Sequence, residues 1–189
     1  VHINADAPQE LTTSAAIYTD EGFKTYEARN AALFGNRTWT PEDQYEGWAD
    51  KSPVTNIPYR WLFARFGAGY ATIRILSIAY AALTMLLLAV FLARTYDRAT
   101  SLIGLTLFGI NFFTAMFNRL GLYESHLIFF IMLALFGFSE AFRPGRSSDG
   151  RAGGVSAALL PRLAFLLVGL AGVGAGFFIK RNMLVIIPA

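Results

Sequence analysis

The sequence predicts an all-α membrane protein that crosses the bilayer several times. Of its 189 residues, 54% are hydrophobic, and these are concentrated in long runs after Tyr70. The first 70 residues hold nine of the thirteen acidic residues but only six of the sixteen Lys and Arg. This composition predicts two segments: an extracytoplasmic loop with juxtamembrane helices at 1–70, and a transmembrane region at 71–189.

The transmembrane region is expected to contain four to five helices. A bilayer core of about 30 Å requires about 20 apolar residues in a helix. Stretches of this kind are expected at residues 71–92, 101–117, 122–138 and 157–178, with a further span starting near 183. Glycines recur along the fourth stretch, at Gly169, Gly172, Gly174 and Gly176. They predict that this helix closely contacts another.

Basic residues in the short loops predict the orientation of the chain. Two loops are rich in arginine and share one side of the membrane: Arg94, Arg98, Arg143, Arg146, Arg151 and Arg162 lie in or beside them. Positive charge favours the cytoplasmic side. The segments 1–65, 118–126 and 180–182 are then expected together on the other side. Because the net charge of +3 belongs to these loops, it does not indicate a nucleic-acid partner.

The first 70 residues are expected to fold outside the membrane, because they contain Trp39, Trp48 and Trp61 among several turn formers. Asp20 is placed to cap a helix from about Glu21 to Phe34, with Gly35 as its C-terminal stop. The helix is expected to be amphipathic and to lie on the membrane or on the spans.

Adjacent carboxylates at Asp20 and Glu21 are the first candidates for chemistry, because a positioned carboxylate can act as a general base. The alternative is structural. Asp20 would then be an ordinary N-cap and Glu21 a first-turn acid favoured by the helix dipole.

Cations near the predicted outer boundary are candidates for binding an anionic lipid phosphate. Arg74 lies four residues into the first span, Arg119 and Glu124 flank a tight turn between two spans, and Lys180 and Arg181 follow the glycine-rich helix. Phosphate oxygens are good partners for such groups. The alternatives are snorkelling or an ion pair for Arg74, a boundary salt bridge for Arg119 and Glu124, and interfacial anchoring for Lys180.

Three segments carry a resemblance to a known family: Asp20-Glu-Gly followed by Ala28-Arg-Asn-Ala-Ala-Leu-Phe-Gly35, Arg74-Ile-Leu-Ser77, and Asn118-Arg-Leu-Gly-Leu-Tyr-Glu-Ser125. They resemble GT-C glycosyltransferases of the protein O-mannosyltransferase and aminoarabinose transferase type. In that family the aspartate of an acidic motif in the first outer loop is the proposed catalytic base. The resemblance assigns this role to Asp20, with Glu21 beside it.

The resemblance also implies a reaction and a location. A sugar would move, with inversion, from a polyprenyl-phosphate donor to a protein, lipid or glycan acceptor. Arg74, Arg119 and Lys180 would bind the donor phosphate, with Glu124 and Arg29 in support. The protein would lie in a bacterial or archaeal plasma membrane, with the site on its outer face. Two alternatives from other classes stay open: a transporter or lipid flippase, and a non-catalytic membrane assembly subunit.

The sequence does not identify a cofactor. It contains no cysteine, and no second His or Cys lies at ligand spacing around His126, so no metal site is expected, although dependence on a divalent metal stays open. The chain begins without Met and stops within an apolar run at 183–189. We therefore expect it to be the N-terminal part of a longer protein, with one more apolar helix before Val1.

Overall fold

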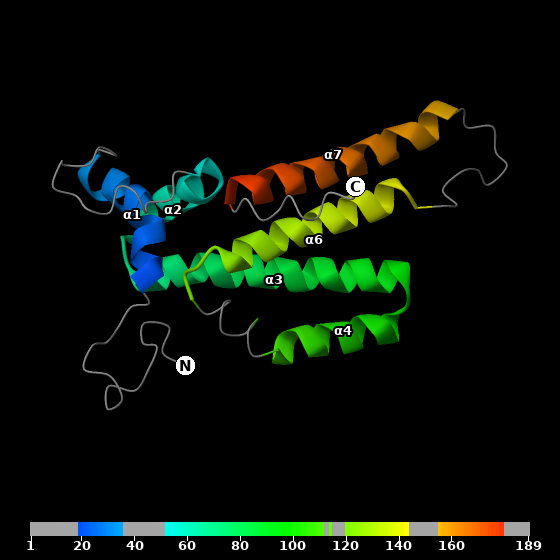
Figure 1. Ribbon diagram of the computed structural model, residues 1–189, viewed down its shortest axis with the longest axis horizontal. Helices are drawn as coiled ribbons and strands as arrows, with labels where there is room; N and C mark the ends of the chain where they lie inside the picture. Colours follow the sequence, from blue (N-terminus) through cyan, green and yellow to red (C-terminus); the bar gives the residue numbers. More distant parts are fainter. Residues whose placement is uncertain (1–18, 36–51, 112–113, 115–119, 144–154, 180–189) are drawn as a thin grey trace. The chain divides into compact units, whose positions relative to one another are not determined.

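A computed structural model describes residues 19–35, 52–111, 114, 120–143 and 155–179, with the backbone alone at 19–24 and 155–158. All regular secondary structure in these residues is helical (Figure 1). The helices are α1 (Thr19–Phe34), α2 (Pro53–Phe66), α3 (Tyr70–Thr95), α4 (Arg98–Ile110), α6 (Glu124–Ala141) and α7 (Val155–Ile179). The prediction of an all-α fold is confirmed.

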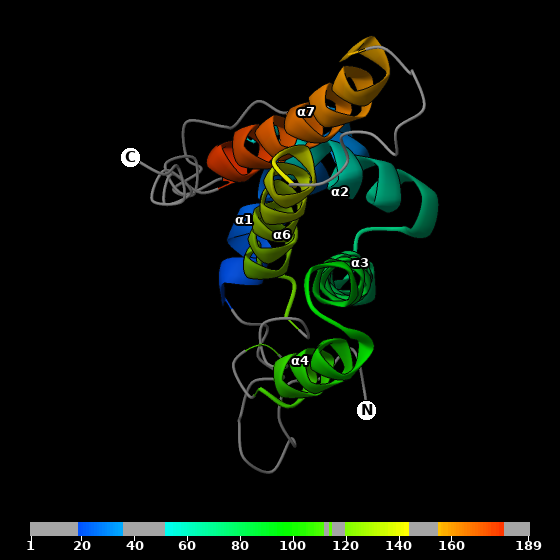
Figure 2. The same cartoon turned by 90° about the vertical axis from the view of Figure 1, so that its right-hand side faces the viewer.

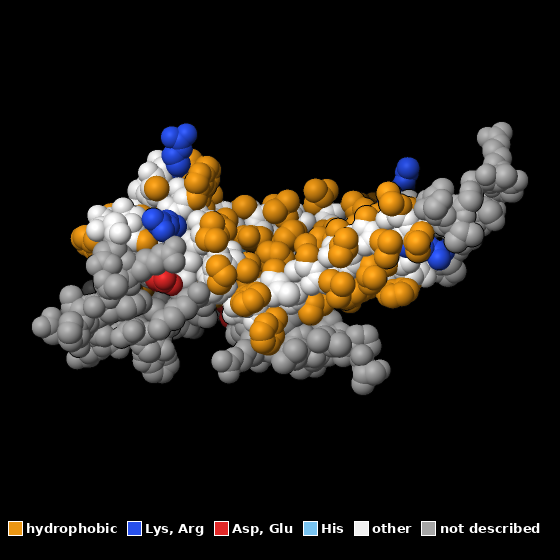
Figure 3. Space-filling view, turned by 90° about the horizontal axis from the view of Figure 1, so that it is seen from above, with side chains coloured by type: hydrophobic (Ala, Val, Ile, Leu, Met, Phe, Trp, Pro, Cys, Tyr) orange, Lys and Arg blue, Asp and Glu red, His pale blue; other side chains and the backbone are white. Residues whose placement is uncertain are grey.

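Three of the described helices are long and apolar enough to cross a membrane: Tyr70–Thr95, Glu124–Ala141 and Leu159–Ile179. Helix α4 is also apolar but has 13 residues, about 20 Å of helix, which is shorter than the bilayer core. Large hydrophobic side chains remain exposed along these helices, and Figure 3 shows hydrophobic side chains spread over much of the visible described surface. Such a surface is stable in lipid and not in water, so the chain is an integral membrane protein.

The chain forms two compact units. The first comprises residues 1–83 and 106–126, and the second comprises residues 84–105 and 127–189. Helices α3, α4 and α6 each contribute residues to both units.

In the first unit, α1 packs against α2 (Figure 1). Gly35 follows the last residue of α1 with φ +67°, a left-handed conformation that favours glycine, and the predicted C-terminal stop is therefore confirmed. Three residues separate α2 from α3. Gly67 adopts φ +85° there, and its carbonyl accepts a hydrogen bond of 2.9 Å from Thr72 Oγ1. This bond fixes the turn between the two helices.

In the second unit, glycines bring α6 and α7 close together, and the two helices run side by side in Figures 1 and 2. A Cβ atom added at Gly137 would lie 2.7 Å from Cα of Gly169. One added at Gly172 would lie 2.7 Å from the backbone nitrogen of Ala134. The predicted close contact is confirmed at Gly169 and Gly172, whereas a Cβ at Gly174 would meet nothing within 4 Å.

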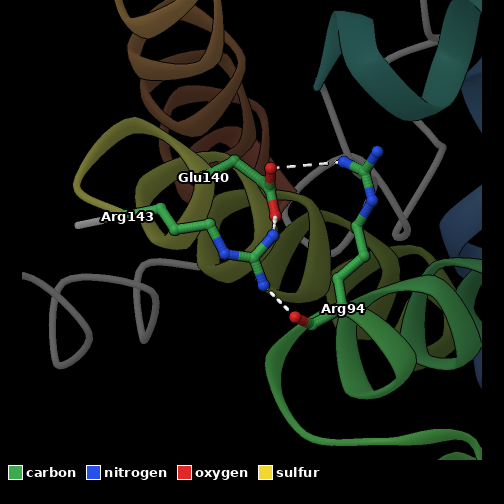
Figure 4. A network of polar contacts seen from close by, with 3 residues as sticks. All are labelled: Arg94, Glu140 and Arg143. Atoms are coloured by element: carbon green, nitrogen blue, oxygen red, sulfur yellow. Dashed lines mark hydrogen bonds and ion pairs between the residues drawn. The ribbon is translucent and has the colours of Figure 1, made fainter. Parts of the chain in front are cut away.

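An ion network joins the ends of α3 and α6 in the same unit (Figure 4). Arg94 Nη1 donates to one carboxylate oxygen of Glu140 at 3.2 Å, and Arg143 Nη1 donates to the other at 2.8 Å. Arg143 also donates to the backbone carbonyl of Arg94. Because the Glu140 side chain is almost fully buried, these two arginines provide the charge compensation that a buried carboxylate requires.

We expect Gly172→Ala to destabilise the protein and Gly174→Ala not to. The methyl group at position 172 would press against backbone atoms of α6 that cannot rotate away, at a cost of about 1–3 kcal/mol. At position 174 the methyl group would meet open space, and alanine would favour the helix by up to about 1 kcal/mol. Thermal unfolding of both variants in the same detergent measures the difference. Equal melting temperatures would contradict this account of the helix contact.

Asp97 provides a test of the start of α4. The backbone N–H of Thr100 donates to its Oδ1 at 2.7 Å, and this bond, with a smaller contribution from the Thr100 side chain, holds the pKa of the Asp97 carboxyl below its usual 3.8. A lowered folded pKa means that the cap stabilises the helix above pH 3.8 and is lost as the pH falls through the folded value.

An NMR acid titration should therefore shift the Thr100 amide resonance with an apparent pKa below 3.8. Asp97→Asn keeps a capping side chain that does not titrate, and should abolish this shift. A wild-type midpoint at or above the usual value would show that the cap is absent.

Candidate functional site

Polar side chains are buried in the first unit, on α1, at the start of α2 and near the beginnings of α3 and α6. Burying polar groups in a largely apolar protein costs free energy unless they are paired, so a concentration of them indicates a structural network or a functional site. The buried polar residues of this unit are Thr25, Ser52, Thr55, Asn56, Thr72, Arg74, Ser77, Ser125 and His126.

Arg74 lies in the second turn of α3 and is 2% exposed. It therefore lies inside the protein and does not extend along the surface to the membrane boundary. Ser77 and Ala81 are buried on the same face of the helix, whereas Ile75 and Ile78 are exposed. A buried guanidinium requires negative or polar partners, so this face of α3 contacts a polar interior.

The turn before α6 packs against this face of α3. Leu120, Leu122 and Tyr123 are all buried, and Ser77 Oγ donates to the Leu122 carbonyl at 3.4 Å. Glu124 follows as the first residue of α6, where the helix dipole favours a carboxylate. The structure therefore places the helix that carries Arg74 beside the turn that precedes Glu124.

Aromatic contacts around His126 link α2, α3 and α6. The His126 ring centroid lies 4.3 Å from that of Tyr80 and 5.7 Å from those of Tyr59 and Tyr123. The imidazole is fully buried. The Leu122 carbonyl and the Glu124 carboxylate lie near it. The ring thus sits at the centre of a histidine–tyrosine cluster, which we define as Tyr59, Tyr80, Tyr123 and His126.

Helix α1 is connected to this region through α2. Glu27 accepts a hydrogen bond of 2.8 Å from the Asn56 side chain, and Thr25 and Ala28 are buried on α1. Helix α1 begins at Thr19, so Asp20 lies within its first turn instead of preceding it. The side chains of Asp20 and Glu21 are outside the described residues.

The remaining predicted site residues are only partly placed. Arg29 is exposed on α1. Arg119 and Lys180 lie outside the described residues. Among the residues that the structure does describe, no group of three His, Asp or Glu is arranged to hold a metal ion.

Sequence reasoning included Ser77 and Tyr123 in the segments that carry the family resemblance but gave them no role, and it did not single out Tyr59 or Tyr80. For Ser77 a signal was available: Arg74, Ser77, Ala81 and Thr84 are polar or small residues at helical spacing within an apolar run, which marks one face of the helix. For the three tyrosines, no local pattern distinguishes a buried cluster from residues of the membrane interface.

The comparisons with known proteins agree with this membrane architecture. The sequence model of the family described as dolichyl-phosphate-mannose-protein mannosyltransferase matches residues 47–188. This range covers α2 to α7 and includes Arg74, Arg119, Glu124 and Lys180, but it leaves out α1 with Asp20 and Glu21. No curated protein and no solved structure matches the chain. The match extends over most of the sequence, and the chain therefore belongs to the dolichyl-phosphate-mannose-protein mannosyltransferase family, a family of membrane glycosyltransferases.

Proposed function

We propose that this protein transfers a sugar from a polyprenyl-phosphate donor of the dolichyl type to an acceptor hydroxyl, on the non-cytoplasmic side of the membrane and with inversion. The family supports the donor class and a protein acceptor. The observation that carries the proposal is the buried Arg74, because a fixed cation inside a membrane protein is suited to an anionic lipid headgroup.

The donor phosphate is the first requirement of the reaction. When the bond between the anomeric carbon and the phosphate oxygen breaks, that oxygen keeps the electron pair and the lipid phosphate gains negative charge. The charge needs compensation more than it needs a proton. We assign Arg74 to this role, together with Arg119 and Lys180 from the polar segments 118–126 and 180–182. Arg74 is preorganised for the role, because its helix is fixed to the turn before α6 through Ser77.

The second requirement is a base for the acceptor. We assign it to Asp20, whose carboxylate takes the hydroxyl proton as the acceptor oxygen bonds to the anomeric carbon, with Glu21 beside it. A single displacement of this kind inverts the anomeric centre. The hydrogen bond between Glu27 and Asn56 supports this assignment, because it fixes α1 to α2 about two turns after Asp20. Glu124 and Arg29 are proposed to orient the charged groups around the substrates.

The proposed face of the membrane follows from the positive-inside rule. Arg94 and Arg143 lie at one end of α3 and α6, whereas Arg74 and Glu124 lie near the beginnings of these helices. If the end with Arg94 and Arg143 is cytoplasmic, the candidate site is on the non-cytoplasmic side.

Asp20→Asn tests the base. Transfer of radiolabelled sugar from the polyprenyl-phosphate donor should fall by about 10²–10⁴-fold in kcat, the usual contribution of a general base. The donor KM should change little. The matched control is Asp97→Asn, which removes a carboxylate that caps α4 outside the proposed site, and it should retain transfer. Unchanged transfer in Asp20→Asn would exclude Asp20 as the base.

Arg74→Gln and Arg74→Lys test the phosphate contact. Losing a charge-assisted hydrogen bond of about 1.5–3 kcal/mol should reduce kcat/KM about 10-fold to 150-fold in the glutamine variant. Lysine keeps the charge but not the planar fork, so its loss should be smaller. Arg98→Gln, at the exposed start of α4, is the matched control.

The melting temperature separates this role from a structural one. A lysine variant that melts like the wild type but transfers more slowly supports the phosphate contact. A folded glutamine variant with wild-type transfer would contradict it. A different outcome would favour a carrier. If the protein moves lipid across the membrane of the vesicles but transfers no sugar from any polyprenyl-phosphate donor, the proposed reaction is wrong.

A further inference from the structure

Helix α2 has an inverted distribution of side chains. Its buried residues are Thr55, Asn56, Tyr59 and Phe63, three of which are polar or carry a hydroxyl group. Its opposite face carries Ile57, 63% exposed, and Trp61, 60% exposed. A helix that faces water usually shows the reverse pattern.

Basic residues share the exposed face of α2 with the apolar ones. Arg60 and Arg65 are both exposed, and α2 contains no acidic residue. At the end of the helix, the Phe66 ring, 71% exposed, meets the Trp61 ring edge-on at 6.4 Å. Aromatic and aliphatic groups beside arginine are typical of helices that lie in a lipid interface.

The connection to α3 restricts how far α2 can be from the bilayer. Only Gly67, Ala68 and Gly69 separate it from Tyr70, the first residue of a membrane-spanning helix. Such a linker reaches at most about 14 Å when fully extended. Here it is held in a turn by the bonds from Thr72 Oγ1 to the Gly67 carbonyl and from the Ile73 amide to the Gly69 carbonyl. The C-terminal end of α2 therefore lies within about 14 Å of the first residue of a membrane-spanning helix.

We propose that the exposed face of α2, formed by Ile57, Arg60, Trp61, Arg65 and Phe66, is a binding surface for anionic phospholipid. The apolar side chains enter the boundary between headgroups and acyl chains. Arg60 and Arg65 bind the phosphates of the same leaflet, and their two positive charges make the surface selective for anionic over zwitterionic lipid. This inference does not depend on the transfer reaction.

The first test measures where Trp61 lies. Trp39 and Trp48 are replaced by phenylalanine, which leaves Trp61 as the sole tryptophan, and the full chain is placed in phosphatidylcholine nanodiscs. Phosphatidylcholine brominated on its acyl chains should remove most of the Trp61 emission, and acrylamide in the water should remove little. Quenching by acrylamide alone would place the face in water. Quenching by neither would place it against protein. Either result would overturn the proposal.

The second test measures the role of the two arginines. Brominated phosphatidylglycerol, added as a minor component, should quench Trp61 more than the same fraction of brominated phosphatidylcholine. Arg60→Gln and Arg65→Gln should each reduce this preference about fivefold, the change that corresponds to about 1 kcal/mol per charge. Arg98→Gln, away from α2, should leave it unchanged. In the single-tryptophan protein that keeps both arginines, equal quenching by the two brominated lipids would exclude selective binding.

Discussion

The absence of water in the bilayer core is the constraint on which the rest of this structure depends. Backbone groups must be satisfied within each segment, which accounts for a fold made of helices. The same constraint acts on side chains, because a charged group that faces lipid is costly. Arg74 and Glu140 are both buried inside the protein, and neither is left to the lipid. Each marks a place where the interior of the protein is polar enough to accept a charge.

These two buried charges are accommodated differently. Glu140 has two arginines within ion-pair distance, so its negative charge is overcompensated by groups of this chain. Arg74 lies on a helix face with Ser77 and Ala81, near a turn whose carbonyl is already bonded to Ser77. The first arrangement is a complete structural network. The second is the arrangement to which we assign the donor phosphate.

Most of the fold could be predicted from the sequence, because length, apolar composition and glycine spacing act locally. Gly35, Gly169 and Gly172 behave as their positions predict. The candidate site was less accessible to this reasoning. Ser77 and Leu122 are 45 residues apart, and the contact between Tyr59 and His126 depends on how α2 and α6 are rotated about their axes. A periodic pattern gives the face of one helix but not the partner that the face meets.

Helix α2 lies within the range that matches the family model, and α1, which carries Asp20 and Glu21, precedes that range. One face of α2 bonds to α1 through Asn56 and Glu27, and it contacts His126 through Tyr59. Its opposite face is the one assigned to lipid. A rotation of α2 about its axis would therefore change its contact with α1 and with α6 together. The α2 side chains that contact α1 and His126 and those that we assign to lipid therefore belong to one rigid helix, so the two proposals share this element.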